Sequence, residues 1–145
     1  MTRAGREPAE DVKRAFRRAI QSAGLKVCQV QMNKSPYGDC RLVMGQAEPE
    51  GWPHESPAVT MHTAVDFTGE VHPVQIQCDA GDEDCPADFW NLPIVQNCSC
   101  QLEDLSETLK ALWAERQVVV DLLKQGVLTL PFTGRWVWSV PNMGG

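Results

Sequence analysis

Residues 58–67, Ala-Val-Thr-Met-His-Thr-Ala-Val-Asp-Phe, alternate between side chains that favour a core and side chains that favour water. Successive side chains of a β-strand point to opposite faces of its sheet, so this stretch has an apolar face and a mostly polar face. The two faces comprise Val59, Met61, Val65 and Phe67 on one side, and Thr60, His62, Ala64 and Asp66 on the other. The pattern predicts a strand of an antiparallel sheet that has a core against one face.

The segments on either side of this stretch predict further strands. Residues 25–32 and 41–44 are rich in apolar side chains and are joined by the turn-forming residues 33–39, so we expect a hairpin with a long loop. Residues 71–78 predict a partner strand for residues 58–67. Pro73 has no backbone N–H to donate to a neighbouring strand, which indicates an edge or an interrupted strand, and we expect an exposed sheet edge at this position.

Two connections and a tail complete the predicted sheet region. Residues 46–57 contain several prolines, which favours an irregular loop. Residues 79–101 are first acidic and then apolar, so we expect a long loop that folds onto the body of the protein. Residues 127–140 resemble a terminal hairpin, in which Trp136 and Trp138 share one face and add a large apolar surface.

Residues 8–23 predict an amphipathic helix. Pro8 suits the first helical position, Glu10 complements the positive end of the helix dipole, and Gly24 permits a left-handed stop. The apolar stripe consists of Val12, Phe16, Ala19, Ile20 and Ala23. The opposite face carries the cations Lys13, Arg14, Arg17 and Arg18. Such a face offers guanidinium groups to carboxylates or phosphates.

Residues 102–125 predict a second, longer helix that ends at Gly126. Its apolar residues recur at spacings of three and four, and Arg116 alone interrupts the seam. The seam consists of Leu102, Leu105, Leu109, Leu112, Val119 and Leu123. Together these segments predict a single α+β domain over residues 1–145. It has a mainly antiparallel sheet of five to six short strands, with the N-terminal amphipathic helix and the long helix packed on it.

Charge is segregated along the chain. Residues 1–18 hold six basic and three acidic side chains, a net charge of +3, so the rest of the chain carries −9 of the overall −6. No lysine or arginine occurs between Arg41 and Lys110, while thirteen acidic residues do. The central segment therefore presents a single sign of potential to a partner.

The sequence also bears on compartment. The charged residues near the N-terminus are not followed by the apolar run of a signal peptide, and no run of about 18 apolar residues occurs. We therefore expect a cytoplasmic or virion-associated protein that is not secreted by a signal peptide and does not enter a membrane. Because cellular reductants keep structural disulfides rare, we expect most of the six cysteines to be thiols.

Four cysteines offer candidate ligands for a metal. Cys78, Cys85, Cys98 and Cys100 supply four soft sulfur atoms, the set that a tetrahedral structural zinc ion requires. Neither pair has the two-residue spacing of a zinc knuckle, so we favour buried, unligated thiols and keep structural zinc as the alternative. We expect no other cofactor.

No pattern in the chain predicts catalysis. The sequence has no nucleophile elbow, no glycine-rich phosphate loop, and no zinc-deaminase motif, since His62 is followed by Thr63 and Ala64. We therefore expect a binding protein rather than an enzyme, with no catalytic residues.

The charge pattern favours a protein that assembles with other proteins. The cationic helix of one copy would dock on the acidic segment of the next, through Lys13, Arg14, Arg17 and Arg18 on one side and Asp82, Glu83 and Asp84 on the other. Trp90, in the apolar half of the long loop, is a further candidate contact. The predicted order of helix, strands, helix and strand resembles that of small phage ring proteins such as tail terminators.

Two other functions remain open at this stage. In one, the acidic segment blocks a basic nucleic-acid-binding site, so the protein is a small inhibitor or regulator. In the other, zinc stabilises the fold and the cationic helix binds nucleic-acid phosphates. Nucleic acid is the less favoured partner, because the central segment repels polyanions.

Overall fold

The computed structural model describes residues 8–34, 40–52, 57–79, 95–127 and 131–139. In chain order, the sheet region begins with helix α1 and five strands: α1 (Pro8–Ser22), β1 (Lys26–Lys34), β2 (Cys40–Glu48), β3 (Val59–Asp66), β4 (Val74–Asp79) and β5 (Val95–Cys100). A short 3₁₀ turn, η1 (Leu102–Asp104), leads into α3 (Leu105–Lys124), and the small strands β6 (Phe132–Thr133) and β7 (Val137–Trp138) follow.

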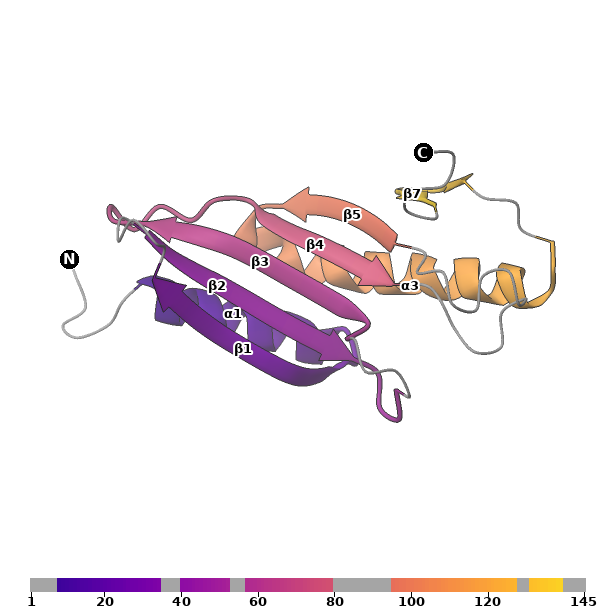
Figure 1. Ribbon diagram of the computed structural model, residues 1–145, viewed down its shortest axis with the longest axis horizontal. Helices are drawn as coiled ribbons and strands as arrows, with labels where there is room; N and C mark the ends of the chain where they lie inside the picture. The colour runs from indigo at the N-terminus through magenta and orange to yellow at the C-terminus, as the bar shows by residue number, and fades with distance from the viewer. Residues whose placement is uncertain (1–7, 35–39, 53–56, 80–94, 128–130, 140–145) are drawn as a thin grey trace.

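The five long strands form one antiparallel meander in the order β1-β2-β3-β4-β5. Each strand pairs with its sequence neighbour, so β1 and β5 form the two edges (Figure 1). The ladder between β1 and β2 has a bulge between Val27 and Gln29. Strands β6 and β7 pair with each other in a separate two-stranded ribbon. The predicted α+β fold with a mainly antiparallel sheet is confirmed.

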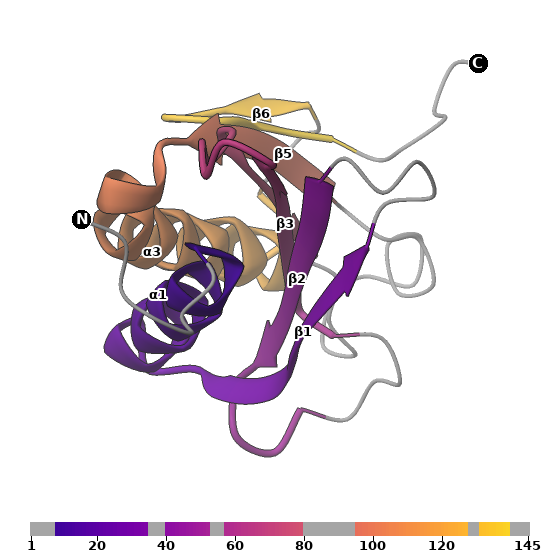
Figure 2. The ribbon, with the colours of Figure 1, turned by 90° about the vertical axis from the view of Figure 1, so that its left-hand side faces the viewer.

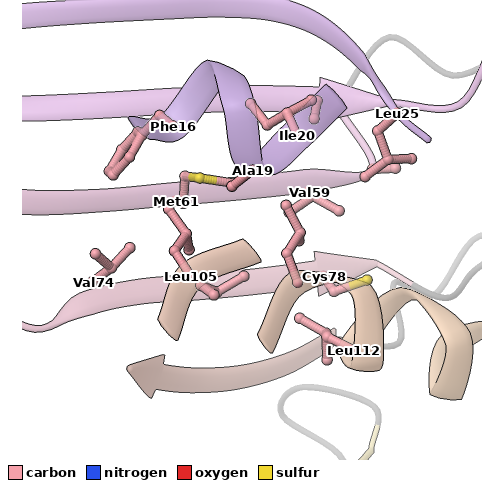
Figure 3. Packing of buried hydrophobic residues seen from close by; sticks show 14 of the residues in the cluster. Phe16, Ala19, Ile20, Leu25, Val59, Met61, Val74, Cys78, Leu105 and Leu112 are labelled. Carbon is pink, nitrogen blue, oxygen red and sulfur yellow. The ribbon is translucent and has the colours of Figure 1, made fainter. Parts of the chain in front are cut away.

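Both helices lie on one face of the sheet (Figure 2). The apolar stripe of α1 packs on β1 and β2, and α3 packs beside α1 and against β4. Figure 3 shows the resulting core, in which Phe16 and Ile20 of α1 lie against strand residues such as Met61. Neither described helix combines the length and the hydropathy that a bilayer span requires.

Several predicted boundaries are correct for the reason given. Gly24 and Gly126 follow the two helices with φ of 78° and 72°, the left-handed conformation that ends a helix without strain. In β3, Val59 and Met61 are fully buried and His62 is exposed, as the alternation predicts.

Other local predictions were wrong. Residues 79–101 were expected to be a loop, but Val95–Cys100 form strand β5, which pairs with β4 along its whole length. Strand β4 is therefore an inner strand rather than an exposed edge. The alternative that Pro73 indicated, an interrupted strand, is confirmed, because Val71 forms an isolated bridge with Val65 and β4 starts only at Val74. This start is one residue beyond the proline, so the missing N–H lies outside the ladder. Phe67 is 86% exposed because β3 ends at Asp66 and the chain turns.

Candidate functional site

The face of the sheet opposite the helices is uncovered by any helix or strand that the structure describes (Figures 1 and 2). Between the strand ends, the strand register places on it Gln29, Gln31, Asn33, Leu42, Met44, Gln46, Thr60, His62, Ala64, Gln75, Gln77 and Ser99. All of these residues are exposed or half-buried. We name this surface the open face.

The open face carries no fixed charge. None of the residues that define it has a carboxylate, ammonium or guanidinium group. Charged side chains share this side of the sheet only at strand ends, where Lys26 pairs with Glu48, Asp66 pairs with Cys40, and Asp79 ends β4. The open face is thus the neutral middle of a sheet surface that carries charged residues at both ends of its strands. Depletion of charge is the compositional mark of the centre of a protein interface.

The centre of the open face is its most apolar part. Leu42 is 41% exposed and pairs with Ala64 across β2 and β3. One step along the same strands, Met44 pairs with His62, and His62 in turn pairs with Gln75 of β4. A small apolar centre surrounded by neutral polar groups can lose its water without burying a charge.

The same surface is poorly suited to nucleic acid. Sheet faces that bind single strands use aromatic side chains on which bases stack and cations that contact the backbone. The open face, as defined from the described strands, has the imidazole of His62 as its one aromatic ring and has no lysine or arginine. Its amide and hydroxyl groups suit another protein surface better.

The predicted cationic face of α1 is present on the helix side of the molecule. Arg17 and Arg18 are exposed, and neither forms an ion pair with any other residue that the structure describes. The other two cations are partly matched within the helix. The Nζ of Lys13 lies 3.9 Å from a carboxylate oxygen of Glu10, and an Nη of Arg14 lies 3.3 Å from one of Asp11.

The proposed partners of this cationic face are not located. Asp82, Glu83, Asp84 and Trp90 lie outside the described residues, so their contact with a neighbouring copy stays a prediction. Arg17 and Arg18 are the strongest candidates for an anionic partner, because exposed guanidinium groups without a local carboxylate remain available to one.

Three of the four candidate zinc ligands lie on the helix side of adjacent strands. Cys78 of β4 is fully buried, while Cys98 and Cys100 of β5 are half-buried. Burial raises the pKa of Cys78 to about 12 and that of Cys98 to about 11, so both thiols are protonated at neutral pH. The described cysteines are free thiols.

The zinc hypothesis is neither supported nor contradicted by these positions. Within the described residues, no group of three or more histidine, cysteine, aspartate or glutamate side chains could hold a metal ion. The fourth candidate ligand, Cys85, lies outside the described part of the chain. Structural zinc therefore stays a prediction.

Arg116 was noted in the sequence only as an interruption of an apolar seam, and the structure gives it a role. The side chain is 4% exposed and its guanidinium lies 4.6 Å from the ring centre of Trp113 and 5.3 Å from that of Trp52. Its Nε donates a hydrogen bond of 3.2 Å to the backbone carbonyl of Asp79. Arg116 thereby joins α3 to the end of β4 and to the segment before β3.

Glu115, the neighbour of Arg116, holds the C-terminal ribbon. Its carboxylate accepts hydrogen bonds from the backbone N–H groups of Arg135 and Trp136, at 2.9 and 3.1 Å, and from the indole N–H of Trp138 at 2.8 Å. A Cβ on Gly134 would lie 2.7 Å from Glu115 Oε1, so a larger residue there would require the carboxylate to shift. Nothing in the local sequence marked Glu115, because its partners lie about twenty residues away.

These contacts govern the charge state of Glu115. Burial by itself raises the pKa of its carboxyl group, but the donors from Trp138, Trp136 and Arg135 outweigh that effect and the net pKa is lowered. The carboxylate is thus a structural anchor that stays ionised at neutral pH.

A groove of about 930 Å³ lies beside this anchor, between the end of β5, α3 and the ribbon. Cations and anions both line it: Lys110 and Arg135 on one hand, and Asp104 and Glu107 on the other. Burial raises the pKa of Cys100, the one thiol on its wall. The raised pKa disfavours the thiolate of Cys100, the form in which a cysteine acts as a nucleophile.

Comparison with known proteins does not assign this chain to a family. No protein-family model, curated protein or solved structure matches it. Function must therefore be argued from the surfaces themselves.

Proposed function

We propose that this protein is a non-enzymatic assembly protein that binds another protein surface through the open face. The observation that carries the proposal is the absence of charge from the middle of a face, five strands wide, that no described helix or strand covers. Water solvates such a face less favourably than a charged one, so covering it costs little desolvation energy. The depleted charge and the apolar centre at Leu42, Met44 and Ala64 match the centre of an interface.

The two sides of the molecule suit assembly in different ways. The open face is neutral, whereas the opposite, helix side presents the exposed guanidinium groups of Arg17 and Arg18. A subunit with unlike surfaces on opposite sides can bridge two partners or extend a ring. This arrangement supports a structural or ring component of the kind that the order of elements suggested, with the acidic segment as the partner of α1.

The chemistry of the groove supports a non-catalytic function. Enzyme sites bring together groups whose pKa values are matched to proton transfer or nucleophilic attack. Here the thiol of Cys100 has a raised pKa, and the carboxylate of Glu115 is engaged by three donors. At neutral pH the thiol of Cys100 is therefore protonated and the carboxyl group of Glu115 is ionised.

Site-specific photo-cross-linking in the cells that make the protein tests the proposal. A benzophenone amino acid replaces Gln75, which is exposed on the open face, and in a matched control replaces Gln21, which is exposed on α1. We expect a discrete protein adduct from position 75 that is lost when His62→Glu is added to the same chain. Two outcomes would contradict the proposal: no adduct forms at position 75, or the adduct still forms when His62→Glu is present.

A further inference from the structure

We infer that the occupant of the open face is a second copy of this chain, docked face to face about a two-fold axis. The inference rests on the proposed function, because it names the partner for the same surface. Three properties of the open face favour an identical partner: its charge, its hydrogen-bonding groups and its area.

The charge of the open face permits self-association. In a two-fold interface the same patch meets itself, so every charged group would approach its own copy or a close neighbour. Like charges placed opposite one another are destabilising. The middle of the open face avoids this penalty, since the charged residues on the same side, Lys26, Glu48, Asp66 and Asp79, lie at strand ends. A partner of opposite charge would find no complement in the middle of this surface.

The hydrogen-bonding groups of the open face are complementary to themselves. Its most frequent side chain is glutamine, whose carboxamide has both donors and an acceptor. Gln29 and Gln31 already show such a pair within β1, where the Nε2 of Gln29 donates to the Oε1 of Gln31 at 2.7 Å. Gln75 and Gln77 of β4 are exposed on the same face. A copy of the face therefore supplies both partners that each carboxamide needs.

The area of the open face is that of a modest dimer. Five strands about 4.8 Å apart, paired over about six residues of 3.3 Å each, cover roughly 500 Å². Two copies would then bury about 1,000 Å² in total, at the lower bound for a specific interface. Sheets stack in this way about 10 Å apart in β-sandwiches. The expected dimer is therefore concentration-dependent.

Position 62 is the most sensitive point of this arrangement. β3 is the central strand, and His62 lies between Met44 on one neighbouring strand and Gln75 on the other. Any two-fold axis through the centre of the open face passes close to this position. The two copies of residue 62 are consequently near each other, whichever way the axis runs in the interface plane.

Paired charge variants at this position test the inference. His62→Glu and His62→Lys are each examined by sedimentation velocity from micromolar to submillimolar concentration, alone and as an equimolar mixture. Wild type should dimerise over this range, and each variant alone should associate at least about tenfold more weakly. The mixture should restore dimers, because the carboxylate and the ammonium then face each other across the axis.

Gln21→Glu and Gln21→Lys on α1 provide matched controls that should dimerise like wild type. Circular dichroism and thermal unfolding establish that all variants are folded. A wild type that stays monomeric throughout overturns the second copy as occupant, and so does a mixture that remains monomeric. An open-face cross-link to a different protein would also overturn it, yet would leave the proposed assembly function standing.

Discussion

The two faces of one sheet differ sharply although the same strands build both. On β3, Met61 is fully buried against the helices while its neighbour His62 is exposed on the open face. The helix face joins residues from both helices and from the strands in one apolar cluster (Figure 3). The open face has no described element against it. The helix face therefore holds the described core of this protein, and the open face is the surface that we propose binds a partner.

The largest effect should come from emptying the helix face. Phe16 is fully buried and its ring packs close to Met61, so Phe16→Ala should lower the free energy of unfolding by about 3–5 kcal/mol. Urea unfolding followed by circular dichroism measures the change. Phe16→Leu keeps most of the volume and should cost markedly less. Equal losses in the two variants would show that this position does not depend on packing.

A smaller loss of stability is expected when a single buried thiol is replaced by a more polar hydroxyl group. Cys78 is fully buried on the helix face and Cys28 is exposed at the bulge of β1. Cys78→Ser places a hydroxyl in an apolar site and should cost about 1–3 kcal/mol, whereas Cys28→Ser should stay within about 0.5 kcal/mol. Chemical denaturation compares the pair. If Cys28→Ser lowered the free energy of unfolding as much as Cys78→Ser, burial of the thiol would not explain the effect.

The anchor of the ribbon should show a comparable effect with a defined pH dependence. Glu115→Gln weakens three hydrogen bonds to a partly exposed carboxylate, and we expect a loss on the order of 1–2 kcal/mol at neutral pH. Because the folded state lowers the pKa of Glu115, its stabilisation is full above the ordinary glutamate pKa of about 4.3. This stabilisation disappears as the pH falls through the lower folded value.

Unfolding curves recorded from pH 6 to pH 3 check this sign. The difference between wild type and Glu115→Gln should shrink as the pH falls. A difference that grows towards low pH would mean that the carboxylate is not the ionised acceptor of the ribbon donors. The fluorescence of Trp138, which is fully buried, reports whether the ribbon has separated from α3.

The smallest effect on stability should come from the open face itself. Gln77 is exposed on β4, and Gln77→Glu should change the free energy of unfolding by no more than about 0.5 kcal/mol. The same variant should weaken association at the open face, because it introduces a charge into a neutral surface. Denaturant unfolding and sedimentation are measured on one sample. If Gln77→Glu strongly lowered the free energy of unfolding but left association unchanged, the open face would contribute to stability rather than to binding.

Local patterns in the sequence predicted most of the elements and which side of each is buried. The three-and-four spacing in α3 and the alternation in β3 correctly identified Leu109, Leu112, Val59 and Met61 as core residues. Strand β5 was missed because its sequence, Val95–Cys100, is short and mostly polar. Its pairing with β4 defines it as a strand, and that pairing is a long-range contact which local periodicity does not encode.

The site was less predictable than the fold. The cationic face of α1 follows from helical spacing alone, and the structure places its four residues on one side of the helix. The open face does not follow from any one segment, since its neutral residues are spread over five strands. Each strand contributes only a few uncharged positions, and these become a single surface only when the register aligns them.

By itself, then, the sequence determined the periods of helix and strand, the glycine stops at Gly24 and Gly126, and the segregation of charge, because each is a property of neighbouring residues. Tertiary structure alone decided that β4 is an inner strand, that Arg116 lies between two indoles, and that Glu115 accepts donors from the ribbon. It also decided that the neutral residues form one continuous face. These features depend on contacts between segments far apart in the chain, which only the folded backbone brings together.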